Sequence, residues 1–196
     1  MAQQLHIWGD RACFRRPEFR RDLVSYDVIT PMAAVRIFEA IHASSSIAWS
    51  VERIEVLSPI RFEWADKTSE AGEPGNRIRL LRNVSYLVTA RFALTDSARL
   101  DDTAAKHAQM FKRKARQGRT TRPPHLGLTQ FPARFALVED VSDVANGGEV
   151  ELRGTIDLGW LLFDHGRAGG HSRFFQACLR DGALSVPPPD APVFAS

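Results

Sequence analysis

The chain has 196 residues, 44% of them hydrophobic, with 26 Lys and Arg against 23 Asp and Glu. This composition excludes a disordered chain and, because no apolar run approaches the roughly 20 residues of a membrane helix, a membrane-spanning one. No signal architecture precedes Trp8, so we expect a soluble, cytoplasmic protein with no membrane partner. Cys13 and Cys178 lie outside any metal-ligand spacing, so we expect reduced thiols and neither metal nor cofactor.

The first part of the sequence predicts two helices among several strands. In chain order we expect a strand over 4–8, an extended segment over 24–29, a helix from 31 to about 43, a strand over 47–61 with a bend at Ser58-Pro59, a polar loop over 63–76, a strand over 84–94, a helix over 103–117 and a strand over 129–138. Thr30 caps the first helix, and Pro31 occupies its first position, where a missing N–H costs nothing. Asp101 or Asp102 caps the second helix, and Gly118 ends it.

The first helix has one apolar face. Its apolar residues recur at spacings of three and four, which predicts burial of that face. These residues are Ala34, Ile37, Phe38 and Ile41.

The second part of the sequence is dominated by strands and turns. We expect a turn at 146–148, a strand over 149–157 that stays extended through 163, a short helix or turn over 171–179, a strand over 183–186 and a proline-rich tail. The order of the first part, βαββαβ, is typical of the ferredoxin-like fold of the α+β class, which many RNA-binding domains adopt. We therefore predict a ferredoxin-like (RRM/RAMP) domain over 1–138 and a small C-terminal antiparallel β-sheet with the tail over 139–196.

The charges are segregated along the sequence. Lys106–Arg122 carries seven cations and no Asp or Glu, and Arg11–Arg21 carries five arginines against Glu18. A solvated helix face usually mixes both signs, so the pattern favours binding of a nucleic acid or another polyanion. The cations that we expect to contact RNA are Arg11, Arg15, Arg16, Arg20, Lys112, Arg113, Lys114, Arg116, Arg119 and Arg122.

Eight stretches between Trp8 and Pro187 follow the pattern of one family. They are WGDRACFRRPEF at 8–19, VSYDVITP at 24–31, IFEAI at 37–41, IEVLSPIRF at 54–62, PHLG at 124–127, QFP at 130–132, DLGWLLFD at 157–164 and RFFQA at 173–177. In their order and spacing they resemble the subtype I-C CRISPR-associated Cas5 proteins, in the d form, of the RAMP superfamily.

The resemblance implies a function as well as a fold. It implies a metal-independent endoribonuclease that cuts CRISPR repeat RNA and stays bound to the 5′ handle of the crRNA. Its partners would be the Cas7 backbone and Cas8 large subunits of a type I-C Cascade-like complex. Two alternatives remain open: a catalytically inactive subunit that only binds the handle, and an RNA-binding domain outside CRISPR.

Three residues are candidates for the chemistry. Metal-free RNA cleavage needs a base, a cation for the phosphorane charge and a proton donor. Lys106 and His107 match the catalytic Lys-His pair of the family by position, although adjacent helix residues point about 100° apart and such pairs are common on plain surface. His42 stands where the family has a Tyr. It is a better base at neutral pH, yet the change equally fits lost cleavage or a simple helix-end hydrogen bond.

Two further features depart from a plain RNA-binding surface. An acidic run over 63–73 stands where relatives often carry basic residues, which predicts few RNA contacts there. Residues 119–128 form a basic loop with Pro123 and Pro124, and His125 within it reads as a turn residue. The tryptophans, which either stack on bases or pack in the core, are Trp8, Trp49, Trp64 and Trp160.

Overall fold

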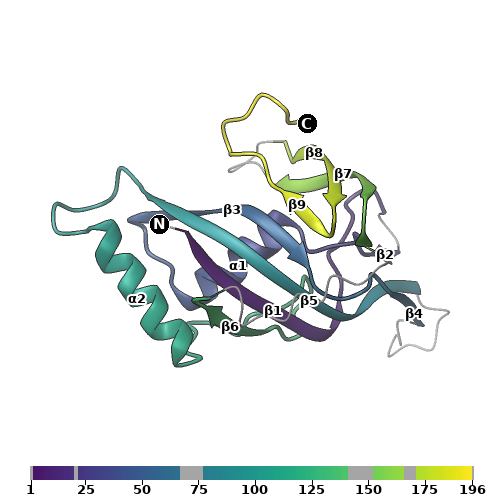
Figure 1. Ribbon diagram of the computed structural model, residues 1–196, viewed down its shortest axis with the longest axis horizontal. Coiled ribbons are helices and arrows are strands. Elements are labelled where there is room, and N and C mark those ends of the chain that lie inside the picture. The colour runs from purple at the N-terminus through teal and green to yellow at the C-terminus, as the bar shows by residue number, and fades with distance from the viewer. Residues whose placement is uncertain (1, 20–21, 67–76, 141–151, 166–170, 196) are drawn as a thin grey trace.

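The computed structural model describes residues 2–19, 22–66, 77–140, 152–165 and 171–195. In chain order its elements are β1 (Gln3–Ala12), β2 (Leu23–Val24), α1 (Pro31–Ile41), β3 (Ile47–Val56), β4 (Phe62–Asp66), β5 (Arg77–Leu94), α2 (Ala104–Arg116), β6 (Arg134–Val138), β7 (Thr155–Asp164), β8 (Arg173–Arg180) and β9 (Ala183–Ser185). The fold is a large, mostly antiparallel sheet with two helices (Figure 1). Neither helix within these ranges is long and apolar enough to span a membrane.

The sheet is organised around the long strand β5. Antiparallel partners flank it on both sides, β1 on one and β3 on the other. β1 also pairs antiparallel with β6, so the strand order at this end is β6-β1-β5-β3. The short strands β2 and β4 both pair with the N-terminal end of β5, β2 parallel and β4 antiparallel. In the first part of the chain the described elements therefore follow the predicted order, with β2 at the start of the extended segment predicted over 24–29 and β4 as an additional short strand.

Local sequence explains β1 and α1. Along β1 the fully buried Leu5 and Ile7 alternate with the partly exposed His6 and Trp8, because successive side chains of a strand face opposite sides. In α1 the predicted cap is confirmed, since the Ala33 N–H donates to Thr30 Oγ1 at 3.2 Å. The four predicted core residues of this helix are all fully buried.

Aromatic rings join α2 to the core. The Phe111 ring stacks on Phe38 of α1, with centroids 5.5 Å apart and planes at 6°, and lies 4.9 Å from the Trp49 ring of β3. Phe111 is fully buried. The inner face of α2 is thereby held against α1, which sets the distance between residues at the two helix ends.

Several predicted boundaries in the first part were wrong. The strand predicted over 84–94 begins earlier, at Arg77, as β5. The predicted strand over 47–61 ends at Val56, because Pro59 has no N–H for a ladder. Part of the predicted loop over 63–76 is strand β4, which pairs with the start of β5, while 67–76 lie outside the described residues. Thr103, and neither Asp101 nor Asp102, caps α2, since the Lys106 N–H donates to its Oγ1 at 3.2 Å.

The C-terminal strands continue the same sheet. β7 pairs with β8, and β9 pairs with β3 through Arg53–Ser185, Ile54–Leu184 and Glu55–Ala183. The helix or turn predicted over 171–179 was wrong, because this segment is β8, and the strand predicted over 129–138 begins only at Arg134. The turn predicted at 146–148 and positions 149–151 lie outside the described residues, and the strand predicted over 149–157 begins only at Thr155, as β7.

Candidate functional site

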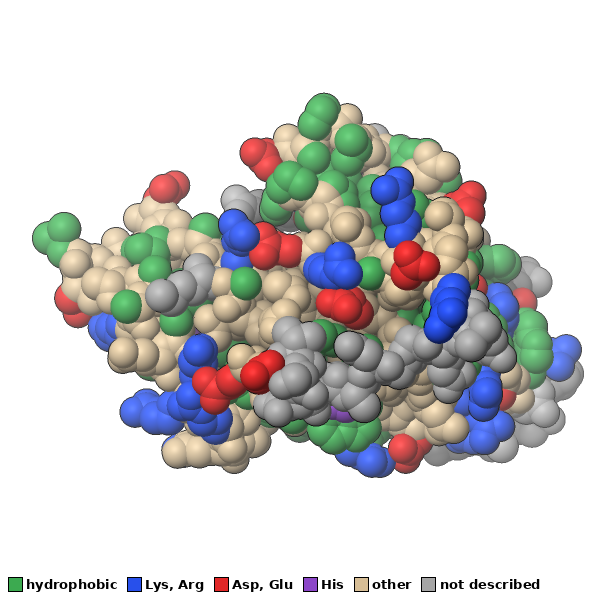
Figure 2. Space-filling view, in the orientation of Figure 1, with side chains coloured by type: hydrophobic (Ala, Val, Ile, Leu, Met, Phe, Trp, Pro, Cys, Tyr) green, Lys and Arg blue, Asp and Glu red, His purple; other side chains and the backbone are tan. Residues whose placement is uncertain are grey.

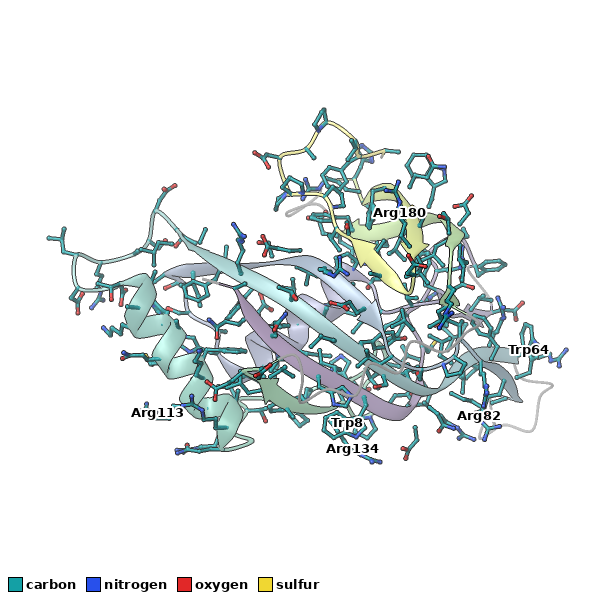
Figure 3. All side chains as sticks on the ribbon, in the orientation of Figure 1. Trp8, Trp64, Arg82, Arg113, Arg134 and Arg180 are labelled. Carbon is teal, nitrogen blue, oxygen red and sulfur yellow. The ribbon has the colours of Figure 1, made fainter. Side chains whose placement is uncertain are left out.

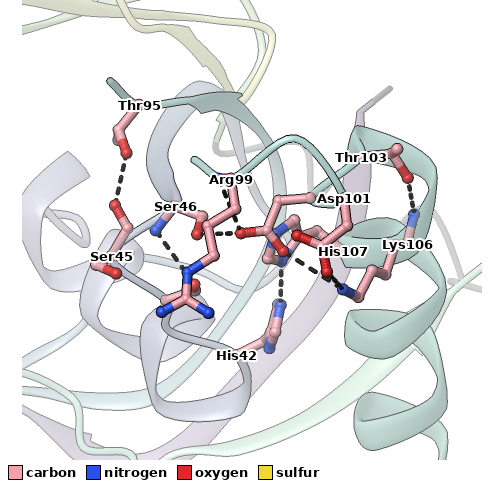
Figure 4. Close-up of polar contacts among 11 residues, drawn as sticks. His42, Ser45, Ser46, Thr95, Arg99, Asp101, Thr103, Lys106 and His107 are labelled. Atoms are coloured by element: carbon pink, nitrogen blue, oxygen red, sulfur yellow. Dashed lines mark hydrogen bonds and ion pairs between the residues drawn. The ribbon is translucent and has the colours of Figure 1, made fainter. Parts of the chain in front are cut away.

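Two histidines meet where α1 and α2 pack together. His42 is the C-cap of α1, and His107 lies in the first turn of α2. His42 Nε2 is 3.0 Å from His107 Nδ1, and both side chains are buried, with residues only 2% and 4% exposed (Figure 4). The Trp49 indole N–H donates to the His42 carbonyl at 2.9 Å and fixes the backbone there. His42 therefore has an imidazole partner, which the sequence did not predict.

The ammonium group of Lys114 determines which ring nitrogens of His42 and His107 carry protons. Lys114 Nζ lies 3.3 Å from His42 Nδ1, and an ammonium group can only donate. A neutral His42 then carries its proton on Nε2 and donates it to His107 Nδ1. A neutral His107 in turn carries its proton on Nε2, on the side of the ring that faces Asp102.

Asp102 connects the buried imidazole to the surface. Its Oδ1 lies 3.7 Å from His107 Nε2 and 3.4 Å from Lys106 Nζ. Its Oδ2 accepts a 2.6 Å hydrogen bond from the Ser46 hydroxyl. This hydroxyl and the backbone N–H of Arg99 hold the pKa of Asp102 below its ordinary value. An anion thus occupies the point on which Lys106 and His107 converge.

The surroundings of His42 disfavour its charged form. Burial lowers the pKa of His42 to about 4, and the positive charge of Lys114 and the neighbouring His107 act in the same direction. A buried imidazole beside an ammonium group stays neutral near pH 7. His42 can therefore pass or hold a proton through its hydrogen bonds without carrying net charge.

Lys106 and His107 are separated by burial. Lys106 has a side chain that is 47% exposed, while that of His107 is 5% exposed, as expected of adjacent positions on a helix. The structure nevertheless brings both groups to Asp102. All three predicted catalytic residues lie in one cluster, with only Lys106 on the surface.

Acidic residues from other segments neutralise much of the basic α2 region. Arg116 makes a bidentate ion pair with Glu139, at 2.7 and 3.0 Å, and Lys112 lies 3.7 Å from the same carboxylate. Arg122 pairs with Glu39 at 3.1 Å. Figure 2 shows Lys and Arg side chains gathering over α2 with acidic side chains beside them. The expectation that acids do not oppose this basic segment was therefore wrong for Lys112, Arg116 and Arg122.

Two exposed arginines of this region are unpaired among the described residues. Arg113 and Arg119 have no ion-pair partner in the part of the chain that the structure describes, and both are exposed. Arg113 points away from α2 (Figure 3). Exposed, unopposed arginines at one end of a helix remain available for phosphate contacts.

The N-terminal arginines divide in the same way. Arg11 pairs with Glu63 at 2.6 Å, and Arg16 pairs with Asp27 at 3.1 Å. Arg15 is exposed and has no ion-pair partner among the described residues, whereas Arg20 lies outside them. Glu63 belongs to the acidic run that stood out in the sequence, and here it neutralises a cation of β1.

Burial separates the tryptophans. Trp49 belongs to the core, while Trp64 and Trp160 are each 54% exposed. Trp64 projects from β4 at the end of the sheet far from α2 (Figure 3), under the guanidinium of Arg77 at 4.8 Å. The candidate site therefore contains a core tryptophan as support, and the exposed rings lie elsewhere.

The roles of Asp102 and Lys114 were missed from the sequence. Asp102 was read as a helix cap, although its spacing of four from Lys106 is a signal for an ion pair. Lys114 was read as a phosphate contact, but it faces His42, 72 residues away in the chain. No local pattern predicts a contact of that separation.

A comparison with known families decides the assignment of the chain. A family model of the Cas5d type, described as CRISPR-associated protein (Cas_Cas5), matches residues 4–190. The chain belongs to the Cas5d family. Two Cas5d relatives carry the name CRISPR pre-crRNA endoribonuclease. The relative from Mannheimia succiniciproducens is 38% identical over 94% of each chain, and that from Thermus thermophilus is 31% identical over 94% of this chain and 90% of its own. The resemblance seen in the sequence is confirmed.

Solved structures share the fold of this Cas5d chain. One, described as a CRISPR-associated protein, has a TM-score of 0.82 at 20% identity, covering 100% of this chain and 97% of its own. A functionally uncharacterized protein from Streptococcus mutans has a TM-score of 0.79 at 21% identity, with the same coverage. At such identities the likeness establishes the fold alone.

Proposed function

We propose that this chain is a cytoplasmic, metal-independent endoribonuclease that cuts CRISPR repeat RNA. The observation that carries the proposal is the convergence of Lys106 Nζ and His107 Nε2 on one carboxylate oxygen of Asp102, at 3.4 and 3.7 Å. A scissile phosphate that replaces this carboxylate meets an ammonium group and an imidazole N–H together. The names of the two Cas5d relatives support the same reaction.

The hydrogen-bonded chain suggests how protons move in this reaction. The 2′-oxygen of the RNA bonds to phosphorus and loses its proton to solvent, while the bond from phosphorus to the 5′-oxygen breaks. Lys106 stabilises the added negative charge. The leaving 5′-oxygen takes the Nε2 proton of His107, which regains one at Nδ1 from His42, and His42 regains one from Lys114. The products are a 2′,3′-cyclic phosphate and a 5′-hydroxyl.

Single-turnover cleavage in EDTA tests this proposal. Purified protein in excess over cognate repeat RNA is expected to cut it, and His107→Ala is expected to lose at least about a hundredfold in rate, as general acid–base residues do. Gln109→Ala, an exposed neutral change on the same helix, is the matched control and should cut like wild type. Cleavage by His107→Ala at the wild-type rate contradicts the proposed role of the imidazole.

A second candidate function is binding of the crRNA 5′ handle without cleavage. Burial of both imidazoles favours it, because RNA reaches neither ring while Asp102 stays in place. In the same assay, tight binding with no cleavage by wild type supports this second function. If wild type cleaves the RNA while His107→Ala binds it without cleaving it, the first function is supported.

The proposal extends to the fold and the assembly. The antiparallel order β6-β1-β5-β3, with α1 and α2 as the two helices, supports a ferredoxin-like RAMP domain over 1–138, with the remaining strands as an appendage at the β3 edge. After cleavage the chain would stay on the 5′ handle beside Cas7 and Cas8 subunits in a type I-C complex. The exposed Trp64 and Trp160 suit contacts with such subunits.

A further inference from the structure

A pocket of about 370 Å³ lies at the opposite end of α1 from His42. Its walls come from the segment after β1, the first turn of α1, the basic loop and β7. Apolar surface is contributed by Phe14, Met32, Leu128 and Leu162, and imidazoles by His125 and His165. A volume in this range fits an organic ligand and exceeds what a lone phosphate fills.

The rim of this pocket is positively charged. Arg15 and Arg36 line it, both exposed, and neither has an ion-pair partner among the described residues. No Asp or Glu belongs to its described lining. The start of α1 adds the positive end of a helix dipole. These two rim arginines, like Arg113 and Arg119, therefore lack the acidic partners that Arg16, Arg116 and Arg122 have.

The basic loop connects this pocket with the catalytic cluster. The Thr121 N–H donates to the carbonyl of Ala40, near the end of α1, at 2.7 Å. Further along, His125 lines the pocket at the start of α1, and a smaller cavity between the two ends is also lined by Arg36 and His125. The loop thus runs beside α1 from one site to the other, a span of about 16 Å for a helix of 11 residues.

Tight backbone contacts hold the pocket open in one shape. The Cys13 N–H donates to the Leu126 carbonyl at 3.1 Å. Gly127 has φ +86°, and a Cβ there would lie 1.8 Å from the Cys13 carbonyl oxygen. Only glycine permits this approach of the loop to the segment after β1. The apolar wall and the charged rim are therefore fixed relative to each other before a ligand binds.

We propose that this pocket holds one unstacked nucleotide of the repeat RNA, a few nucleotides from the scissile phosphate. The base packs on the partly exposed Met32 and Leu128, an imidazole offers it a hydrogen bond, and Arg15 and Arg36 bind its phosphate. Single-stranded RNA is recognised in this way, by bases that leave the stack and enter apolar pockets. The inference rests on the proposed function, because it assumes that repeat RNA is the ligand.

Two variants separate the charge of the pocket from its volume. Arg15→Ala/Arg36→Ala removes the two rim cations, and Arg53→Ala/Arg180→Ala is the matched control, with equal charge loss from exposed positions on β3 and β8. Leu128→Trp fills the pocket without a change of charge. Binding is measured with repeat RNA that carries a 2′-deoxy nucleotide at the cut and therefore cannot be cleaved.

Wild type is expected to bind this RNA, and the rim variant to bind it about tenfold more weakly. The slope of log K against log salt concentration should be less steep for the rim variant by about 1 to 1.4. The control is expected to bind like wild type. In a series of RNAs that each carry one abasic nucleotide, the affinity of wild type should fall sharply when the abasic nucleotide stands at one particular position. The affinity of Leu128→Trp should not change when the abasic nucleotide stands at that same position. Both results support the pocket.

Other outcomes overturn the proposal in distinguishable ways. If wild type binds and cuts repeat RNA while the rim and Leu128→Trp variants bind equally well, the pocket fails and the proposed function stands. If the rim variant and its control lose affinity equally, the effect is one of general charge and the pocket fails. If wild type does not bind repeat RNA, both ideas fail together.

Discussion

Protonation of His42 is expected to cost folding stability. In the folded chain the residue is 2% exposed, and burial, with Lys114 and His107, lowers the pKa of its imidazole to about 4. In the unfolded chain the same group has its ordinary pKa of about 6.5. Between these values the unfolded state binds a proton that the folded state refuses, so the free energy of unfolding falls as the pH falls.

The size of the effect follows from the two pKa values. One pKa unit corresponds to about 1.4 kcal/mol, so the difference between about 6.5 and about 4 corresponds to about 3 kcal/mol. This stability is complete above pH 6.5 and is lost progressively as the pH falls to about 4. A loss of that size is a large part of the total stability of an ordinary domain.

Urea unfolding at a series of pH values from 7.5 to 4.5 measures this linkage. The His42→Gln variant has no titrating group at the site, so its free energy of unfolding should fall by about 2 to 3 kcal/mol less than that of wild type over this range. Lys114→Met removes the adjacent positive charge, so it should raise the pKa of His42 and flatten the curve. Identical pH dependence in wild type and His42→Gln would refute a neutral, buried His42.

Three further predictions follow from packing and charge. Gly127→Ala should cost on the order of 3 kcal/mol in urea unfolding because its Cβ meets the Cys13 carbonyl, whereas Gly118→Ala, with φ +63° but open space, should cost only about 1. Phe111→Ala should cost about 3–5 kcal/mol, since a fully buried ring is lost, and an unchanged urea midpoint would contradict its core role. Asp102→Asn keeps its shape but loses its charge, so non-cleavable repeat RNA should bind severalfold more tightly, and weaker binding would show that the carboxylate does not compete with phosphate.

Elements with strong local signals could be predicted from the sequence. The Thr30 cap, the proline after it and the apolar face of α1 all depend on residues within one or two helical turns, and the structure confirms them. β8 and β4 were missed because their strand conformation comes from pairing with β7 and β5. A cross-strand partner is set by tertiary structure and overrides weak local preference.

The amino-acid sequence by itself determined the family, the two helices, the apolar face of α1 and the three residues proposed for catalysis. Only the tertiary structure decided what those residues can do. It placed His42 against His107, 65 positions away in the chain. It also placed Lys114 beside His42 and Asp102 beside His107. It also brought Glu39 and Glu139 onto a basic segment that has no acid of its own. Charge, burial and proton position depend on neighbours in space, and packing alone selects those neighbours.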